Sequence, residues 1–151
     1  MGILSTVISL FGCSKAIQKP KEVLTSISMA QSHMNRAYCY SFSIYRNNSD
    51  YIFSAWCMVE KGTELYDIDI ENVEITEEEF DFFKELDKEY NFISNQKEKS
   101  KNEKYFVSDQ TTNSFKVGYG SDEFDLKTED ECYHKAYDYF AELAIKYSNG
   151  G

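Results

Sequence analysis

Proline, the residue that most often breaks helices and strands, is almost missing from this sequence. The 151 residues contain one proline, against 24 tyrosine, phenylalanine and tryptophan residues. Chains that remain disordered are poor in aromatic residues, so this composition predicts an ordered chain with a preference for β-structure. The length suits one domain with its own core. We place that domain at residues 23–151, after an apolar segment (1–13) and a polar linker (14–22).

Histidines and paired cysteines, which serve many catalytic and metal sites, are also scarce. Only His33 and His134 occur, and the four cysteines form no C-x-x-C pair. A lone loop histidine such as His33 is usually just exposed, whereas His134 and Asp138, four residues apart, are typical of a surface ion pair on a helix. We therefore predict no enzymatic activity, no cofactor and no metal site. The cysteines are interpreted as reduced and buried, as in cytoplasmic proteins.

Neither a phosphate-binding loop nor a convergent set of metal ligands is found. The glycines at 118 and 120 are not followed by the G-x-G-x-x-G pattern or by a Walker lysine. Asp67, Asp69 and Glu71 alternate along an expected strand, about 7 Å apart, and so do not converge as the ligands of a calcium loop do. We interpret them as charges that protect an edge strand against aggregation.

A basic face that could neutralise nucleic-acid phosphates is lacking as well. The net charge is −10, and residues 60–89 alone contain thirteen acidic residues and three lysines. Nucleic-acid binding is therefore disfavoured. The acidic block either faces a basic protein partner or is a solvated surface that keeps the protein in solution.

The strongest pattern that is present is a hairpin at residues 37–60. Two aromatic, β-branched runs flank the turn formers Asn47–Asp50. With this turn, residues whose numbers add up to 97 oppose each other, so Tyr40 faces Cys57. Cys39 and Cys57 then lie on opposite faces and do not form a disulfide.

The two faces of this hairpin differ in polarity. The predicted core face is almost wholly apolar and comprises Tyr38, Tyr40, Phe42, Ile44, Phe53, Ala55, Cys57 and Val59. The other face is mixed, and we expect it to be half solvated or covered by something small: Cys39, Ser41, Ser43, Tyr45, Ile52, Ser54, Trp56 and Met58. Because aromatic residues and methionine are enriched at interfaces, Tyr45, Trp56 and Met58 are the candidate partner-facing residues.

The remaining segments predict an α+β fold. Two T-x-x-E capping boxes, at Thr76 and at Thr128, begin amphipathic helices over about 77–90 and 129–147. Residues 91–104 are expected to be a mobile loop or a long hairpin connection. Further strands are expected at 23–31, 64–75, 105–107, 114–119 and 123–126. We predict an antiparallel sheet of six or seven strands built around the hairpin, with both helices on its core face.

The apolar segment 1–13 has three interpretations. As a short helix it has one apolar stripe and would dock on the domain, for example on the mixed hairpin face. Its Leu10-Phe11-Gly12-Cys13 sequence resembles a bacterial lipoprotein box, which implies lipidation of Cys13 and membrane association. Gly2 and Thr6 also fit a myristoylation pattern.

These observations predict a small acidic binding protein in the cytoplasm, with a basic protein as its partner. An inhibitor that neutralises a basic toxin would need such charge complementarity and no chemistry of its own. One alternative is an accessory domain tethered to a membrane as a lipoprotein through residues 1–13. A second alternative is a hydrolase that uses His33 or His134.

Overall fold

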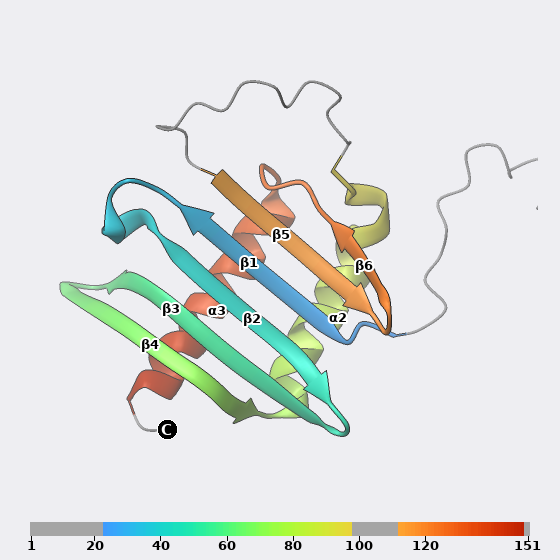
Figure 1. Ribbon diagram of the computed structural model, residues 1–151, viewed down its shortest axis with the longest axis horizontal. Coiled ribbons are helices and arrows are strands. Elements are labelled where there is room, and N and C mark those ends of the chain that lie inside the picture. Colours follow the sequence, from blue (N-terminus) through green and yellow to red (C-terminus); the bar gives the residue numbers. More distant parts are fainter. Residues whose placement is uncertain (1–22, 98–111, 150–151) are drawn as a thin grey trace, which may run out of the picture.

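The computed structural model describes residues 23–97 and 112–149 (Figure 1). They form an α+β domain with one antiparallel six-stranded sheet, in the order β4-β3-β2-β1-β5-β6. The strands are β1 Ser26–Ser32, β2 Tyr40–Asn47, β3 Asp50–Lys61, β4 Glu64–Ile75, β5 Thr112–Tyr119 and β6 Asp122–Asp125. The helices are α2 Glu77–Tyr90 and α3 Glu131–Ser148, with short 3-10 helices η1 Arg36–Tyr38 and η2 Phe92–Asn95.

Three predictions fall on residues outside those ranges. They are the apolar helix or targeting segment at 1–13 with Cys13, the linker at 14–22, and the strand at 105–107. In the described ranges, no helix combines the length and the hydropathy that a membrane span requires.

The β2–β3 hairpin has the predicted register. Tyr40 pairs with Cys57 and Asn47 with Asp50, so Asn48 and Ser49 form the loop. Asn48 has a φ of +59°, a conformation that asparagine tolerates better than most residues. Cys57 is buried in the core, Cys39 is half-buried on the other side, and both thiols are free.

Both helices pack on one face of the sheet, behind it in the view of Figure 1. Aromatic stacking joins the layers: the ring centroids of Phe42 and Phe140 are 5.2 Å apart, and those of Tyr51 and Phe80 are 4.2 Å apart. The predicted core residues of the hairpin are buried apart from Tyr38, which is 57% exposed. Tyr38 belongs to η1 and not to β2, so strand alternation does not govern its side chain.

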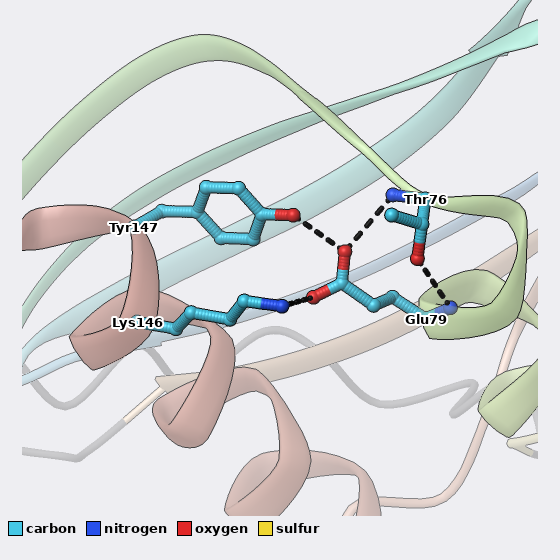
Figure 2. Close-up of polar contacts among 4 residues, drawn as sticks. All are labelled: Thr76, Glu79, Lys146 and Tyr147. Atoms are coloured by element: carbon cyan, nitrogen blue, oxygen red, sulfur yellow. Dashed lines mark hydrogen bonds and ion pairs between the residues drawn. The ribbon is translucent and has the colours of Figure 1, made fainter. Parts of the chain in front are cut away.

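Helix α2 begins as the sequence predicts, and its capping box is part of a larger network (Figure 2). The Thr76 hydroxyl accepts the Glu79 N–H at 3.1 Å, and the Glu79 carboxylate accepts the Thr76 N–H at 2.9 Å. The same carboxylate accepts hydrogen bonds from Lys146, at 2.9 Å, and from the Tyr147 hydroxyl. Glu79 thereby ties the first turn of α2 to the last turn of α3.

The predicted capping box at Thr128 is wrong. Helix α3 begins at Glu131, its N-cap is Asp130, and the Asp130 side chain makes no capping hydrogen bond. Leu126 is buried just before the helix, and its N–H donates to the Phe115 carbonyl, which holds this part of the chain against β5. The position of the helix start is therefore set by tertiary packing.

Two further expectations need correction. The stretch 91–104 was expected to be a mobile loop or a long hairpin connection, yet its first part forms η2 and buries Phe92 and Ile93, because these apolar side chains close the core beyond α2. The first strand begins at Ser26, and not at residue 23, where Val23 is 62% exposed.

Candidate partner-binding site on the open sheet face

The sheet face turned away from α2 and α3, here called the open face, is covered by neither helix (Figure 1). Small side chains dominate it: Ser28 pairs with Ser43 across β1 and β2, and Ser43 pairs with Ser54 across β2 and β3. Serine hydroxyls tolerate water, so this face needs no second layer to be stable. Its small side chains also allow another molecule to approach the sheet closely.

A shallow hollow of about 320 Å³ lies on the open face, over β2, β3 and β4. Its walls combine serine hydroxyls, one aromatic ring and two carboxylates: Ser41, Ser43, Ser54, Trp56, Asp69 and Glu71. Trp56 is 41% exposed and lies directly between Ser41 and Asp69 in the strand register. Hydroxyls and carboxylates accept hydrogen bonds, and a tryptophan face attracts cations. The hollow therefore has the chemistry of a site for a cationic side chain.

The chain's own Arg36 already contacts this site as a cationic side chain would. The guanidinium carbon of Arg36 lies 3.7 Å from the Trp56 ring centroid, and a guanidinium nitrogen lies 3.1 Å from an Asp67 carboxylate oxygen. Helix η1 carries Arg36, and the Asn35 side chain caps that helix by accepting the Ala37 N–H. Tryptophan and aspartate on this face are thus spaced to bind a guanidinium between them.

The three predicted partner-facing residues are not equally placed. Trp56 lines the hollow, and Met58, two residues along β3, is half-buried beside Asp67 in the strand register. Tyr45 is 44% exposed but pairs with Ile52. That position is four residues from Trp56 along the strand, or about 13 Å. The structure therefore brings Trp56 and Met58 together and leaves Tyr45 at the other end of the hairpin.

Sequence reasoning treated the acidic row and the aromatic face as separate features, although the structure joins them. Residues 56 and 69 pair because β3 and β4 are connected by a two-residue loop, Gly62–Thr63, with Gly62 at a φ of +66°. Gly62 lies between the hairpin expected at 37–60 and the strand expected at 64–75, and counting outward from a two-residue turn there would have placed Asp69 beside Trp56. Counting residue pairs outward from this turn is therefore the signal in the sequence that could have found the site.

A β-bulge near the end of the acidic row was also missed. Ser54 faces two residues of β4, Glu71 and Asn72, where the register shifts between Phe53 and Ala55. Asn72 has a φ of +53°, and its N–H donates to the Ser54 hydroxyl at 3.0 Å. The bulge interrupts the alternation of β4 side chains between the two faces of the sheet after Glu71. Among the residues described, no three histidine, cysteine or acidic side chains are grouped closely enough to hold a metal ion.

The two histidines lie on different elements. His33 follows β1, and its Nδ1 accepts the Asn35 N–H at 2.9 Å. His134 is exposed on α3, and no ion pair joins it to Asp138, so the expected pair is not formed. Its neighbour Lys135 instead contacts Glu89 at 3.2 Å.

The buried thiols and phenols of the core are held in their neutral forms. Burial raises the pKa of the Cys57 thiol to about 12, and burial raises that of Cys132 to the same value. Burial and a mutual hydrogen bond raise the pKa of Tyr40, whose hydroxyl contacts that of Tyr133. A thiol reacts as its thiolate, so these two cysteines are poor nucleophiles near neutral pH.

The chain matches no protein family, no curated protein and no solved structure. The assignment of a function therefore depends on the geometry above.

Proposed function

We propose that this protein is a non-enzymatic binding protein that recognises a basic partner protein through its open face. One observation carries the proposal: the β3–β4 register sets Trp56 beside Asp67 and Asp69 on a face that neither helix covers, where a guanidinium already stacks. A lysine or arginine of the partner would enter the neighbouring hollow, with Trp56 on one side and Asp69 on the other.

Charge and composition support a basic partner. Acidic side chains follow β4 along the rim of the hollow, and residues 60–75 contain six acidic residues and one lysine. The other acidic residues of the block 60–89 belong to α2, on the opposite face of the sheet. Complementary charge accelerates association and selects among partners, and it is screened by salt. Aromatic anchors supply much of the affinity of protein interfaces. The predicted complex therefore weakens in salt and depends on Trp56.

The experiment is site-specific photo-crosslinking in the native host. A photoreactive phenylalanine derivative replaces Leu65, which is 55% exposed on β4 outside the hollow, and in a matched control it replaces Lys88, whose side chain is 74% exposed on α2. We expect one basic protein to be crosslinked from position 65 and not from position 88. The crosslink should be lost in the variant that also carries Trp56→Ala and Asp69→Asn.

The proposal is wrong if position 65 yields no basic protein, or if crosslinking is unchanged by the double substitution. Trp56 and Asp69 are both exposed, so these substitutions should leave the fold intact. Thermal unfolding of the purified variant checks this.

A further inference from the structure

Strand β4 forms one edge of the sheet, as Figure 1 shows. It has 12 residues, Glu64–Ile75, and in the described part of the chain it pairs with β3 alone. The outward N–H and C=O groups of an edge strand can bind another extended chain as an added strand. The opposite edge, β6, has only four residues and offers much less backbone.

The turn between β3 and β4 determines which backbone groups of β4 point outward. Lys61 and Glu64 flank a two-residue loop. In such a hairpin the flanking pair exchanges both backbone hydrogen bonds, and bonded and non-bonded pairs then alternate. Tyr66, Ile68 and Ile70 therefore direct their N–H and C=O groups toward β3. Leu65, Asp67 and Asp69 direct theirs away from the sheet.

The same three residues present their side chains on the open face. Leu65 is 55% exposed, the Asp67 side chain is 72% exposed, and Asp69 opposes Trp56. The bulge at Glu71 and Asn72 interrupts the strand beyond this point. The regular edge is therefore the seven-residue run 64–70, long enough for a short added strand.

Charge decides which chain suits this edge. If two copies of β4 paired antiparallel around Asp67, that carboxylate would oppose its own copy, and like charges directly opposite are destabilising. A segment with lysine or arginine at alternate positions would instead place every cationic side chain on the open face, next to Asp69 and next to Asp67, whose carboxylate also pairs with the chain's own Arg36. The period of two in a strand makes this the complementary pattern.

We propose that the edge of β4 binds an extended basic segment of the partner as a seventh strand of the sheet. This inference rests on the proposed function and adds its geometry: backbone hydrogen bonds at Leu65, Asp67 and Asp69, and alternate cationic side chains over the acidic row and the hollow.

The test uses two synthetic seven-residue peptides with capped ends. One alternates lysine and threonine, beginning and ending with lysine, and the other has the same composition with the four lysines together. Trp56 is the single tryptophan of the chain and reports binding by its fluorescence. We expect the alternating peptide to bind the full chain at low ionic strength at least fivefold more tightly than the blocked peptide. It should also slow hydrogen exchange at the amides of Asp67 and Asp69.

A pair of variants separates the backbone from the charge. Asp67→Ala and Asp67→Pro both remove the carboxylate, but only proline removes the outward N–H. Proline is tolerated on edge strands where its nitrogen faces away from the sheet. We expect Asp67→Pro to weaken binding of the alternating peptide at least tenfold relative to Asp67→Ala.

Equal binding of the two peptides, or unchanged hydrogen exchange at residues 67 and 69, would overturn the added strand. The hydrogen-exchange measurement uses the unmodified chain, so it does not depend on how well the proline variant folds. If both peptides bind equally and the binding still requires Trp56, the proposed function stands and only the edge geometry fails. If no binding requires Trp56 or Asp69, both proposals fail.

Discussion

Glu79 shows how much of this fold depends on single side chains. Glu79 is only 8% exposed. Among the described residues it is the one charged residue that is buried. Its carboxylate is satisfied by the Thr76 N–H, Lys146 and Tyr147 (Figure 2). A buried charge is stable only when it is paired and hydrogen-bonded in this way.

We expect Glu79→Ala to lower the free energy of unfolding by about 2–3 kcal/mol, because several hydrogen bonds to a charged group are lost together. Tyr147→Phe removes one of them and should cost about 1 kcal/mol. Lys146→Ala should cost less, since the lysine side chain is 58% exposed and water screens its ion pair. Urea unfolding of the three variants measures how much free energy of unfolding each one loses. An equal loss for Lys146→Ala and Glu79→Ala would contradict the expected order.

The same network makes the stability depend on pH. Burial on its own would raise the pKa of Glu79, but the hydrogen bonds from Thr76, Tyr147 and Lys146 outweigh burial, and the pKa is lowered from 4.5. The contribution of Glu79 is therefore present above pH 4.5 and is lost as the pH falls through the folded-state pKa. The stability difference between the wild type and Glu79→Gln should shrink below pH 4.5. A difference that grows in acid would contradict the assigned sign.

The side chain of Ser26 occupies the space beside Gly118. A Cβ atom at this position would lie 2.2 Å from the Ser26 hydroxyl oxygen of the neighbouring strand β1. That hydroxyl can rotate, so we expect Gly118→Ala to cost only about 1 kcal/mol. The double variant Gly118→Ala, Ser26→Ala should regain most of this loss in thermal unfolding. A loss that persists in the double variant would show that the backbone itself is strained.

At the scale of elements, the two long helices begin in different ways. Thr76 caps α2 through its hydroxyl, whereas the Asp130 side chain makes no capping hydrogen bond to α3. An N-cap hydrogen bond stabilises a helix by about 1 kcal/mol, while a carboxylate near a helix start stabilises it by about a few tenths of a kcal/mol through the helix dipole. We expect Thr76→Ala to destabilise the protein at least twice as much as Asp130→Ala. Chemical unfolding of both variants measures this, and equal losses would refute the difference.

The same comparison shows what local sequence predicts about elements. The box at Thr76 was predicted correctly because an acidic turn is followed directly by an apolar helical stripe. The box at Thr128 has the same pattern and does not form, since Leu126 ties the preceding residues to β5. Phe92 and Ile93 were likewise assigned to a loop because a charged run follows them, although both are buried.

At the scale of the whole molecule, the helices cover one face of the sheet, and the open face carries the proposed site. Among the described cysteines, Cys57 and Cys132 are buried free thiols and Cys39 is a half-buried one, and the expectation of a cytoplasmic protein comes from the unpaired cysteines of the sequence. We therefore expect the intact mass of the protein from its native host to include residues 2–13. A membrane-bound species that begins at Cys13 and carries added lipid mass would contradict this and establish the lipoprotein alternative.

The sequence by itself determined the β2–β3 hairpin, its register and the separation of apolar from mixed residues on it. It also determined helix α2 with its capping box, and the α+β class. These features depend on interactions between residues close together in the chain: turn formers, alternation with a period of two, and caps. They can be read without knowledge of the remainder of the fold.

Only the tertiary structure decided which distant residues meet. It packed Glu79 against Tyr147, moved the start of α3 to Glu131 and stacked Arg36 on Trp56 beside Asp67. Such contacts depend on how two layers pack over the whole sheet, which no local pattern specifies. The candidate site is of this kind: Trp56 was recognised from its strand, but the acidic residues beside it belong to the next strand.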